Sequence, residues 1–275
     1  MELKIIETGY FRGDGGAAFG LLPRKIWNRH YPADGDHYCL MAMRCAVLIT
    51  ERKRILLDTG PGTKQPNRLK GYRMERLATP DSVLKTWGIE AEEITDVILS
   101  HLHFDHCGHA TRFDEKSGKT VPTFPRARYH VGKSQWERSL APGPADYDAY
   151  FTENMEAVEK AGLLHLRESE YEVDDGVYIR SYDGHTPGQL VTVFNCGKEE
   201  YVFAGDTVPL ALNATVRSVS AFDLHAEESM RTKTEILGEA ADRNRILIFS
   251  HDAYTPAARI KRVNDSFKVS EAVRL

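Results

Sequence analysis

Metal-binding residue types crowd one short stretch of the chain, residues 101–106. Its candidate ligands are His101, His103, Asp105 and His106. In an extended segment, residues two apart point the same way, so the first three can converge on one side. The fourth requires a turn, for which Cys107 and Gly108 are well placed. Imidazole and carboxylate groups at this spacing suit zinc, iron, manganese or cobalt, so the stretch predicts a metal site rather than a surface histidine cluster.

Three further candidate ligands follow along the chain. Glycine and proline around His185 let the backbone bring its imidazole close to a metal. Asp206 and His251 each end a hydrophobic run that is typical of a buried strand. The carboxylate of Asp206 could bridge two ions through its two oxygens. Taken singly, each residue is more typical of a structural role, but their order and their places at strand ends indicate one shared site.

The segments that must position these residues alternate between strand-like and helix-like patterns. Strands are expected at 46–50, 54–58, 95–100, 177–179, 189–194, 200–204 and 245–249. A helix is expected to begin at Pro80, capped by Thr79, and two others span 147–161 and 226–241. Mixed strands and helices with hairpins predict an α/β or α+β sandwich, and no linker divides residues 1–275, so a single domain is expected.

Composition narrows the class of protein. The 275 residues are 41% hydrophobic and 28% charged, which is typical of a globular protein. With 36 basic and 40 acidic residues, the chain offers no basic face for nucleic acid or an anionic membrane. No apolar stretch is long enough to span a bilayer, and the N-terminus lacks the apolar core of a signal peptide. A cytoplasmic enzyme without nucleic-acid or membrane partners is the default expectation.

The stretch from Ser100 to Gly108, Ser-His-Leu-His-Phe-Asp-His-Cys-Gly, resembles the signature of the metallo-β-lactamase superfamily. Leu-Asp-Thr-Gly at 57–60 resembles its upstream motif, and 184–188, 205–206 and 250–251 resemble its later ones in the family order. The resemblance covers most of the chain. It implies a four-layer αββα sandwich with a dinuclear metal site at one edge of the two sheets.

The resemblance also implies a role for each candidate residue. One metal ion is held by His101, His103 and His185, the other by Asp105, His106 and His251, and Asp206 bridges them. Two divalent ions are implied, with zinc as the first choice and manganese, iron or cobalt as alternatives. Asp58 is implied to orient a ligand loop, although a strand-terminal turn is an equally good explanation. Asp105 is the expected proton shuttle, in a hydrolysis by a hydroxide that the two ions share.

Departures from the family pattern narrow the branch. Redox di-iron members carry Glu where this chain has His103, which argues against oxygen chemistry. The commonest zinc β-lactamases carry Cys at the position of Asp206, which argues against antibiotic cleavage. Glyoxalase II-type thioesterases add a basic C-terminal part that has no clear equivalent after His251, and nuclease members are longer and basic. Residues 14–27 resemble a segment of the quorum-quenching N-acyl homoserine lactonase branch, which includes phosphotriesterase-like relatives.

In that branch the segment forms a hydrophobic loop over the site or at a dimer contact; a glycine-rich turn feeding a core strand is the alternative. An exposed surface of Phe19, Leu21, Leu22 and Trp27 would suit an acyl chain or a second subunit, so a homodimer is considered. His109, His130 and His225 are also considered for the pocket, with a structural or solvent-facing role favoured for each.

A lactonase that opens a cyclic ester, N-acyl homoserine lactone-like or other, is the leading prediction, with a small-molecule lactone or ester as its substrate. The best-known lactonases carry a substrate-contacting Tyr where this chain has Pro209, so the group that assists the leaving oxygen stays open. A phosphotriesterase, arylesterase or thioesterase of the same fold is the alternative. From another class, a non-catalytic ligand-binding relative is disfavoured, because every candidate ligand is present.

Overall fold

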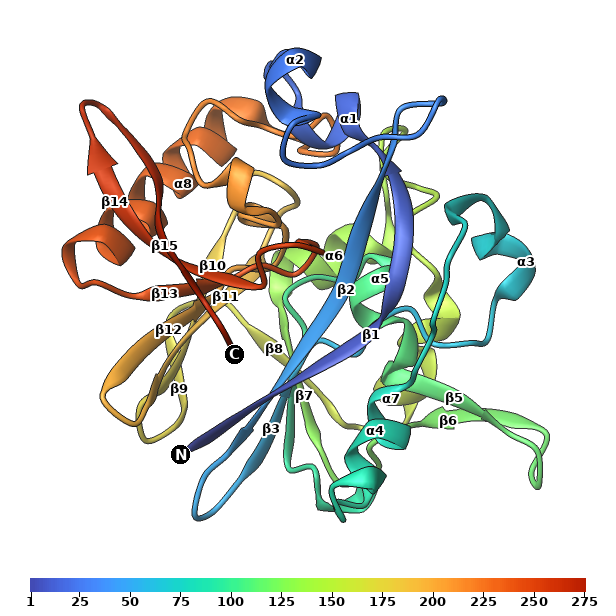
Figure 1. Cartoon of the computed structure of the whole chain (residues 1–275). Coiled ribbons are helices and arrows are strands. Elements are labelled where there is room, and N and C mark those ends of the chain that lie inside the picture. Colours follow the sequence, from blue (N-terminus) through green and yellow to red (C-terminus); the bar gives the residue numbers. More distant parts are fainter.

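Two β-sheets lie face to face at the centre of the fold, and helices cover the outer face of each (Figure 1). The computed structural model describes residues 1–275. The six-stranded sheet has the order β1 (Glu2–Asp14), β2 (Tyr38–Ile49), β3 (Arg54–Leu57), β4 (Asp96–Ile98), β7 (Arg128–Gly132) and β8 (Leu164–Arg167). The seven-stranded sheet has the order β15 (Ser266–Val273), β14 (Ala257–Val263), β13 (Ile246–Ile248), β12 (Glu199–Phe203), β11 (Gln189–Cys196), β10 (Val177–Tyr182) and β9 (Tyr171–Asp174).

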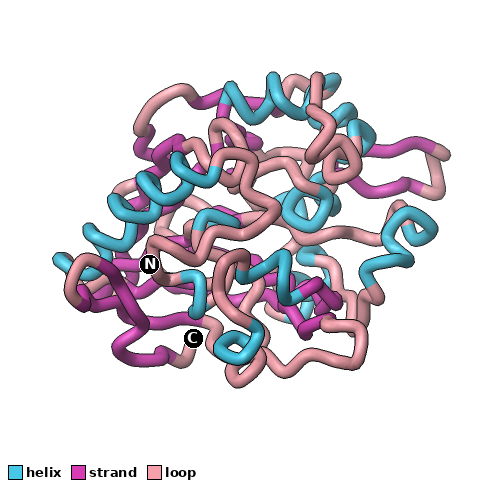
Figure 2. The backbone as a smooth tube through the Cα atoms, turned by 90° about the horizontal axis from the view of Figure 1, so that it is seen from above, coloured by secondary structure: helices cyan, strands magenta, loops and turns pink.

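The helices are mostly short. The outer face of the six-stranded sheet packs against α4 (Pro80–Thr86), α6 (Lys133–Leu140) and α7 (Glu156–Lys160), and that of the other sheet against α8 (Ala226–Asp242). The connections carry α1 (Gly15–Phe19), α2 (Arg24–Trp27), α3 (Pro66–Leu69) and α5 (Phe104–Cys107). A hairpin of β5 (Thr111–Asp114) and β6 (Lys119–Pro122) projects at one side, as the view from above shows (Figure 2). None of the helices combines the length and apolar character that crossing a membrane requires.

Alternation along the central strands explains the layering. In β2 and β3, Leu48 and Leu57 face the second sheet, while Val47 and Leu56 face the helices. Successive side chains of a strand point to opposite faces, and here both faces are covered, so these strands are hydrophobic throughout. The expected four-layer αββα sandwich of the α/β class is confirmed.

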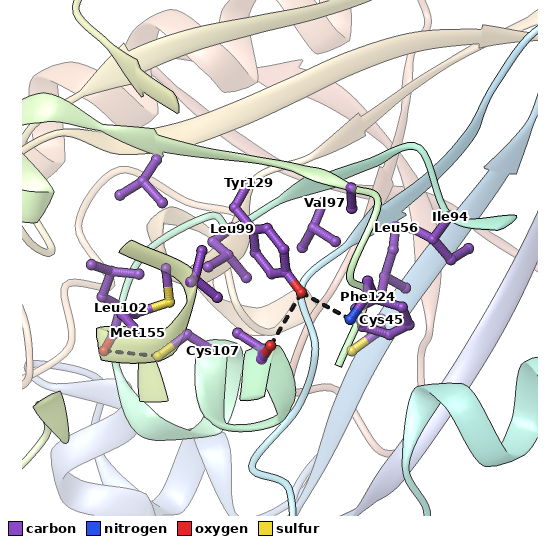
Figure 3. Packing of buried hydrophobic residues seen from close by; sticks show 14 of the residues in the cluster. Cys45, Leu56, Ile94, Val97, Leu99, Leu102, Cys107, Phe124, Tyr129 and Met155 are labelled. Carbon is purple, nitrogen blue, oxygen red and sulfur yellow. Dashed lines mark hydrogen bonds between the residues drawn. The ribbon is translucent and has the colours of Figure 1, made fainter. Parts of the chain in front are cut away.

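Polar atoms inside the helix-side core are paired. The hydroxyl of Tyr129 donates to the carbonyl oxygen of Ala110 at 3.1 Å and accepts from the backbone N–H of Phe124 at 3.1 Å (Figure 3). A buried hydroxyl without a partner would cost about 1–3 kcal/mol. These bonds therefore let a tyrosine fill the space between the sheet and the segment that follows the histidine motif.

One expected helix is largely absent. Of residues 147–161, only a 3₁₀ turn at Thr152–Asn154 and the short α7 are helical. The preceding loop is tied to its neighbours instead: the backbone N–H of Phe104 donates to the carbonyl oxygen of Ala149 at 2.9 Å. Tertiary contacts here outweigh the helix propensity of the segment.

A buried charge network at the first residue of β4 predicts that the fold is less stable in acid. Asp96 accepts from Nε2 of His130 at 2.9 Å and pairs with Lys53 at 3.2 Å, while Arg167 donates to the other ring nitrogen of His130. Although burial raises the pKa of Asp96, hydrogen bonds from His130 and Thr95 and the charge of Lys53 bring it down from 3.8 to about 2. Since the folded protein holds this carboxylate's proton more weakly, the network stabilises the fold above pH 4, and that stabilisation is lost as the pH falls towards 2.

We expect Asp96→Asn to lower the free energy of unfolding at pH 7 by about 2–4 kcal/mol. Urea titrations at pH 7 and at pH 3 measure the effect, and the gap between wild type and variant should narrow at pH 3. A gap of the same size at both pH values would show that the carboxylate charge does not stabilise the fold.

Candidate metal centre

The candidate ligands follow the carboxyl ends of strands that run in one direction within their sheets. In the first sheet, β3 and β4 are parallel, and in the second, β12 and β13 are parallel, with β10 pointing the same way because β11 is antiparallel to both of its neighbours. The loops after these strands therefore meet at one edge of the sandwich. They carry Asp58, His101, His103, Asp105, His106, His185, Asp206 and His251.

The histidine motif turns earlier than expected. His101 and His103 follow β4 in extended backbone, but α5 begins at Phe104, so the chain turns before His106 rather than at Cys107 and Gly108. Asp105 and His106 thus project from one helical turn. Gly108 has another role, because a Cβ there would lie 2.0 Å from the carbonyl oxygen of Pro61. Glycine is required for the upstream loop to pass this close.

One group of nitrogen atoms gathers around His103. Nδ1 of His103 lies 3.0 Å from Nε2 of His101 and 3.3 Å from Nε2 of His185. All three imidazoles are buried. The three ligand atoms lie within 4.8 Å of one another, which is the spread expected for donors around one cation.

A second group gathers beside it. Nε2 of His106 lies 3.1 Å from Nε2 of His251, and Oδ2 of Asp105 lies 3.7 Å and 3.5 Å from these two atoms. Asp206 stands between the groups. Its Oδ1 is 3.0 Å from Nε2 of His251 and 3.2 Å from Nε2 of His106, whereas its Oδ2 is 3.8 Å from Nε2 of His185.

The outward nitrogens of these histidines show that the inward ones carry lone pairs. Nδ1 of His106 meets a carboxylate oxygen of Asp58 at 2.8 Å, Nδ1 of His185 meets Asp223 at 2.9 Å, and Nδ1 of His251 meets the carbonyl oxygen of Ala42 at 2.8 Å. Each partner can only accept, so each Nδ1 carries the proton in the neutral ring.

In the neutral rings, the Nε2 lone pairs of His106 and His251 therefore face one another at 3.1 Å with no proton between them. Such an arrangement is repulsive unless a cation lies among the donors. The donor set of imidazoles and carboxylates suits a divalent first-row ion. The residues present thus fit the metal ions that the sequence motif implies.

Asp58 connects the two groups of candidate ligands through hydrogen bonds. It ends β3 with φ of 57°, a left-handed conformation that Asp tolerates better than most residues. Its Oδ1 accepts from the backbone N–H of Ser100 at 2.7 Å, and its Oδ2 accepts from the Ser100 hydroxyl at 2.8 Å. The same hydroxyl lies 3.1 Å from Nδ1 of His101. One carboxylate thereby orients His106 directly and His101 through Ser100.

Burial and mutual charge set the ionisation of the cluster. Burial, with the neighbouring imidazoles, holds the pKa of His101 and of His103 well below the usual range, so both stay neutral. Burial raises the pKa of Asp206, but His251 and His106 outweigh it and hold that pKa well below its usual range. Burial lowers the pKa of the other three imidazoles, but Asp206 outweighs it at His106 and His251, and Asp223 outweighs it at His185, so these three pKa values are raised. Metal ions bind neutral imidazoles and ionised carboxylates, so a metal ion would have to displace protons from these three rings.

A cavity of about 290 Å³ opens over the cluster. Its base includes Asp105, Asp206 and three of the histidines, and its wall is mostly apolar. Phe11 and Met41 come from β1 and β2, and the ring of Phe11 meets His251 edge-on at 5.3 Å between ring centroids. A small molecule with an apolar part could therefore reach the cluster.

Comparison with known proteins agrees with this geometry. The family model described as the metallo-beta-lactamase superfamily matches residues 44–251, which include every candidate ligand. The chain belongs to the metallo-β-lactamase superfamily. A solved structure of a probable metal-dependent hydrolase from Staphylococcus aureus shares the fold with a TM-score of 0.87 at 21% identity, covering 99% of this chain and 98% of that one. The dizinc quorum-quenching lactonase AidC, bound to a homoserine product, gives 0.77 at 20% identity over 99% and 95%.

The matches to sequence relatives cover only part of each protein. An N-acyl homoserine lactonase from Bacillus thuringiensis is 28% identical over 159 residues, which is 52% of this chain and 54% of that protein. Integrator complex subunit 11 from Gallus gallus is 26% identical over 168 residues, or 59% of this chain and 27% of that protein. The matched part thus spans about half of the lactonase and about a quarter of the Integrator subunit.

The N-terminal segment of this metallo-β-lactamase chain is placed differently from our expectation. An exposed hydrophobic surface is wrong for Phe19 and Trp27: both are buried, and their rings stack at 5.6 Å between centroids. Leu22 packs against the same cluster, while Leu21 is 83% exposed and is not part of the cavity wall. From this segment only Ala18 lines the cavity.

His109 is also outside the cavity wall. It is buried, and its Nε2 bonds a carboxylate oxygen of Asp81 at 2.8 Å, so it has the structural role that the sequence favoured. Two residues of the site were not anticipated. Asp223 orients His185 from an irregular loop that carries no recognisable motif, and Tyr72 lines the cavity from the connection after α3.

Proposed function

We propose that the chain is a hydrolase that uses two divalent cations to open the ring of a lactone. The observation that carries this proposal is the position of Asp206, whose two oxygens face two separate groups of converging imidazoles. Zinc is the proposed ion, because imidazole and carboxylate ligands suit it and the structurally similar AidC is a dizinc lactonase.

Two cations held in this way would activate a water molecule and polarise the carbonyl group of the substrate. The ligand roles we propose are His101, His103 and His185 for one ion, Asp105, His106 and His251 for the other, and Asp206 for both. Asp105 is half-buried at the base of the cavity, and one of its oxygens lies near His106 and His251. We assign it the transfer of the water proton to the oxygen that leaves when the ring opens.

The wall of the cavity supports a neutral substrate with an apolar chain. The wall over the cluster includes the apolar side chains of Phe11, Met41, Leu210 and Phe222, against which an acyl chain could pack. The same wall would accept an arylester or a phosphotriester, which therefore remains the second candidate substrate class. Pro209 lines this wall and has no side-chain hydroxyl or N–H to donate, so any donor to the leaving oxygen must come from elsewhere.

A substrate panel with and without metal tests the proposal. The purified protein loaded with Zn²⁺ or Mn²⁺ should contain two ions per chain by elemental analysis and release acid from γ-lactones with acyl substituents. Removal of the ions with a chelator should abolish turnover, and adding them back should restore it. Turnover of paraoxon-like triesters with none of lactones would transfer the proposal to the second candidate. Absence of turnover on lactones, esters, thioesters and triesters by the loaded protein would contradict hydrolysis altogether.

A further inference from the structure

Apart from the candidate histidine ligands, every charged side chain of the cavity wall is acidic. Its acidic residues are Asp105, Asp146, Asp148 and Asp206, and no lysine or arginine contributes to it. Asp105 and Asp206 face the candidate ligands. Asp146 is neutralised by Arg138, with contacts of 2.7 Å and 2.9 Å to its two oxygens. Asp148 is exposed at the rim, and its negative charge has no such partner.

The charge of Asp148 acts inside the cavity as well as in solvent. Tyr72 lines the same cavity and is half-buried, and its ring packs on Phe104 at 4.7 Å between centroids. Burial, together with the carboxylates of Asp105 and Asp148, raises the pKa of Tyr72 to about 12. The hydroxyl of Tyr72 therefore lies in a negative potential to which Asp148 contributes.

We propose that Asp148 is a specificity residue that makes the cavity favour uncharged or cationic substrates over anionic ones; the inference rests on the proposed function of this site. Proteins bind carboxylate and phosphate groups with arginine or lysine side chains or with backbone N–H groups. Here an anionic tail would meet no basic side chain and would approach an unpaired carboxylate. Like charges in a partly desolvated site oppose binding, so discrimination arises from repulsion.

The inference names a substrate class. Acyl chains without charge, or with a terminal amine, fit the wall, whereas chains that end in a carboxylate or phosphate are rejected. This favours simple acyl lactones and neutral triesters over thioesters of anionic carriers. Two bound metal ions would not remove the distinction, because Asp105 and Asp206 would partly balance their charge while the charge of Asp148 has no paired side chain.

Binding of matched hydroxamates tests the inference without turnover. A hydroxamate group chelates metal ions, so hydroxamates of six and eight carbons can be compared with the same chains ending in a carboxylate or an amine. Calorimetric titration of the metal-loaded protein at low salt should give weaker binding for the carboxylate tail than for the neutral one. In Asp148→Asn the ratio of the two dissociation constants should fall about threefold, and in Asp148→Lys it should fall further, with both effects reduced in 0.5 M NaCl.

Glu159→Gln is the matched control, because it removes one negative charge from the exposed side of α7, outside the cavity wall. Its ratio should equal that of wild type. Equal affinity of wild type for the neutral and the carboxylate tails, or a ratio unchanged in Asp148→Lys, would overturn the role of Asp148. If the titrations show selection by charge but no lactone is hydrolysed, the proposed reaction would be wrong and the role of Asp148 would stand. If no hydroxamate binds, both the proposed metal centre and the proposed role of Asp148 would be wrong.

Discussion

Asp206→Asn is expected to lower kcat/KM by about 10³-fold or more, which corresponds to about 4 kcal/mol of lost transition-state stabilisation. The amide keeps the shape of the side chain but offers one neutral oxygen where two anionic oxygens now face His106 and His185. Two cations held close together would then repel each other without a charge between them. Elemental analysis should accordingly find fewer than two ions per chain.

Asp96→Asn is the control for this variant. It replaces another buried carboxylate by an amide, but at the opposite end of β4, where Asp96 bonds His130. It should lower stability while metal content and kcat/KM stay close to those of wild type. If Asp206→Asn retained two ions and full activity, the bridging role of Asp206 would be wrong.

The convergence of the candidate ligands could be anticipated from sequence, because most of the residues concerned form short local motifs. Each candidate ligand is a chemically distinctive residue in a loop or helical turn that follows a hydrophobic strand, and the rigid sheet restricts where such a residue can lie. Four of the candidate ligands lie within the six residues from His101 to His106. The sequence did not predict where the turn lies: α5 begins at Phe104, whose backbone N–H has no acceptor within the helix and donates to the carbonyl oxygen of Ala149 in a distant loop.

The cavity was harder to anticipate than its base. Hydrophobicity predicts that a residue such as Phe19 is buried or contacts a ligand, but it does not distinguish these outcomes. The structure decides between them, because Trp27 and Tyr31 lie against Phe19 and leave Ala18 facing the cavity. Contributors such as Tyr72 and Asp223 lie in connections without periodicity, where only the fold brings them near the histidines.

Strands at the sheet edges were also missed. The long β1 and the hairpin of β14 and β15 contain many charged residues, and most of their residues are half-buried or exposed. A strand with one open face has a weaker hydrophobic signal than the central β2, whose side chains are almost all buried. The pattern therefore identified the interior of each sheet better than its borders.

Asp58→Asn should weaken metal binding about 10–100-fold while the fold persists. Asn tolerates the left-handed backbone of position 58 as well as Asp does, so the change is confined to the side chain. One amide oxygen can still accept from Ser100, but the NH₂ group would meet the proton on Nδ1 of His106. To avoid two donors facing each other, the proton must move to Nε2 of His106, which is the atom needed to bind the metal ion.

Chelator competition on the loaded protein measures this loss, and thermal unfolding of the metal-free protein separates it from instability. Asp81→Asn is the matched control, because Asp81 makes the same kind of contact with His109 at 2.8 Å, away from the candidate ligands. It should cost stability without changing metal affinity. Equal metal affinity in Asp58→Asn and wild type would mean that Asp58 only terminates β3 and that His106 keeps its tautomer without help from the carboxylate.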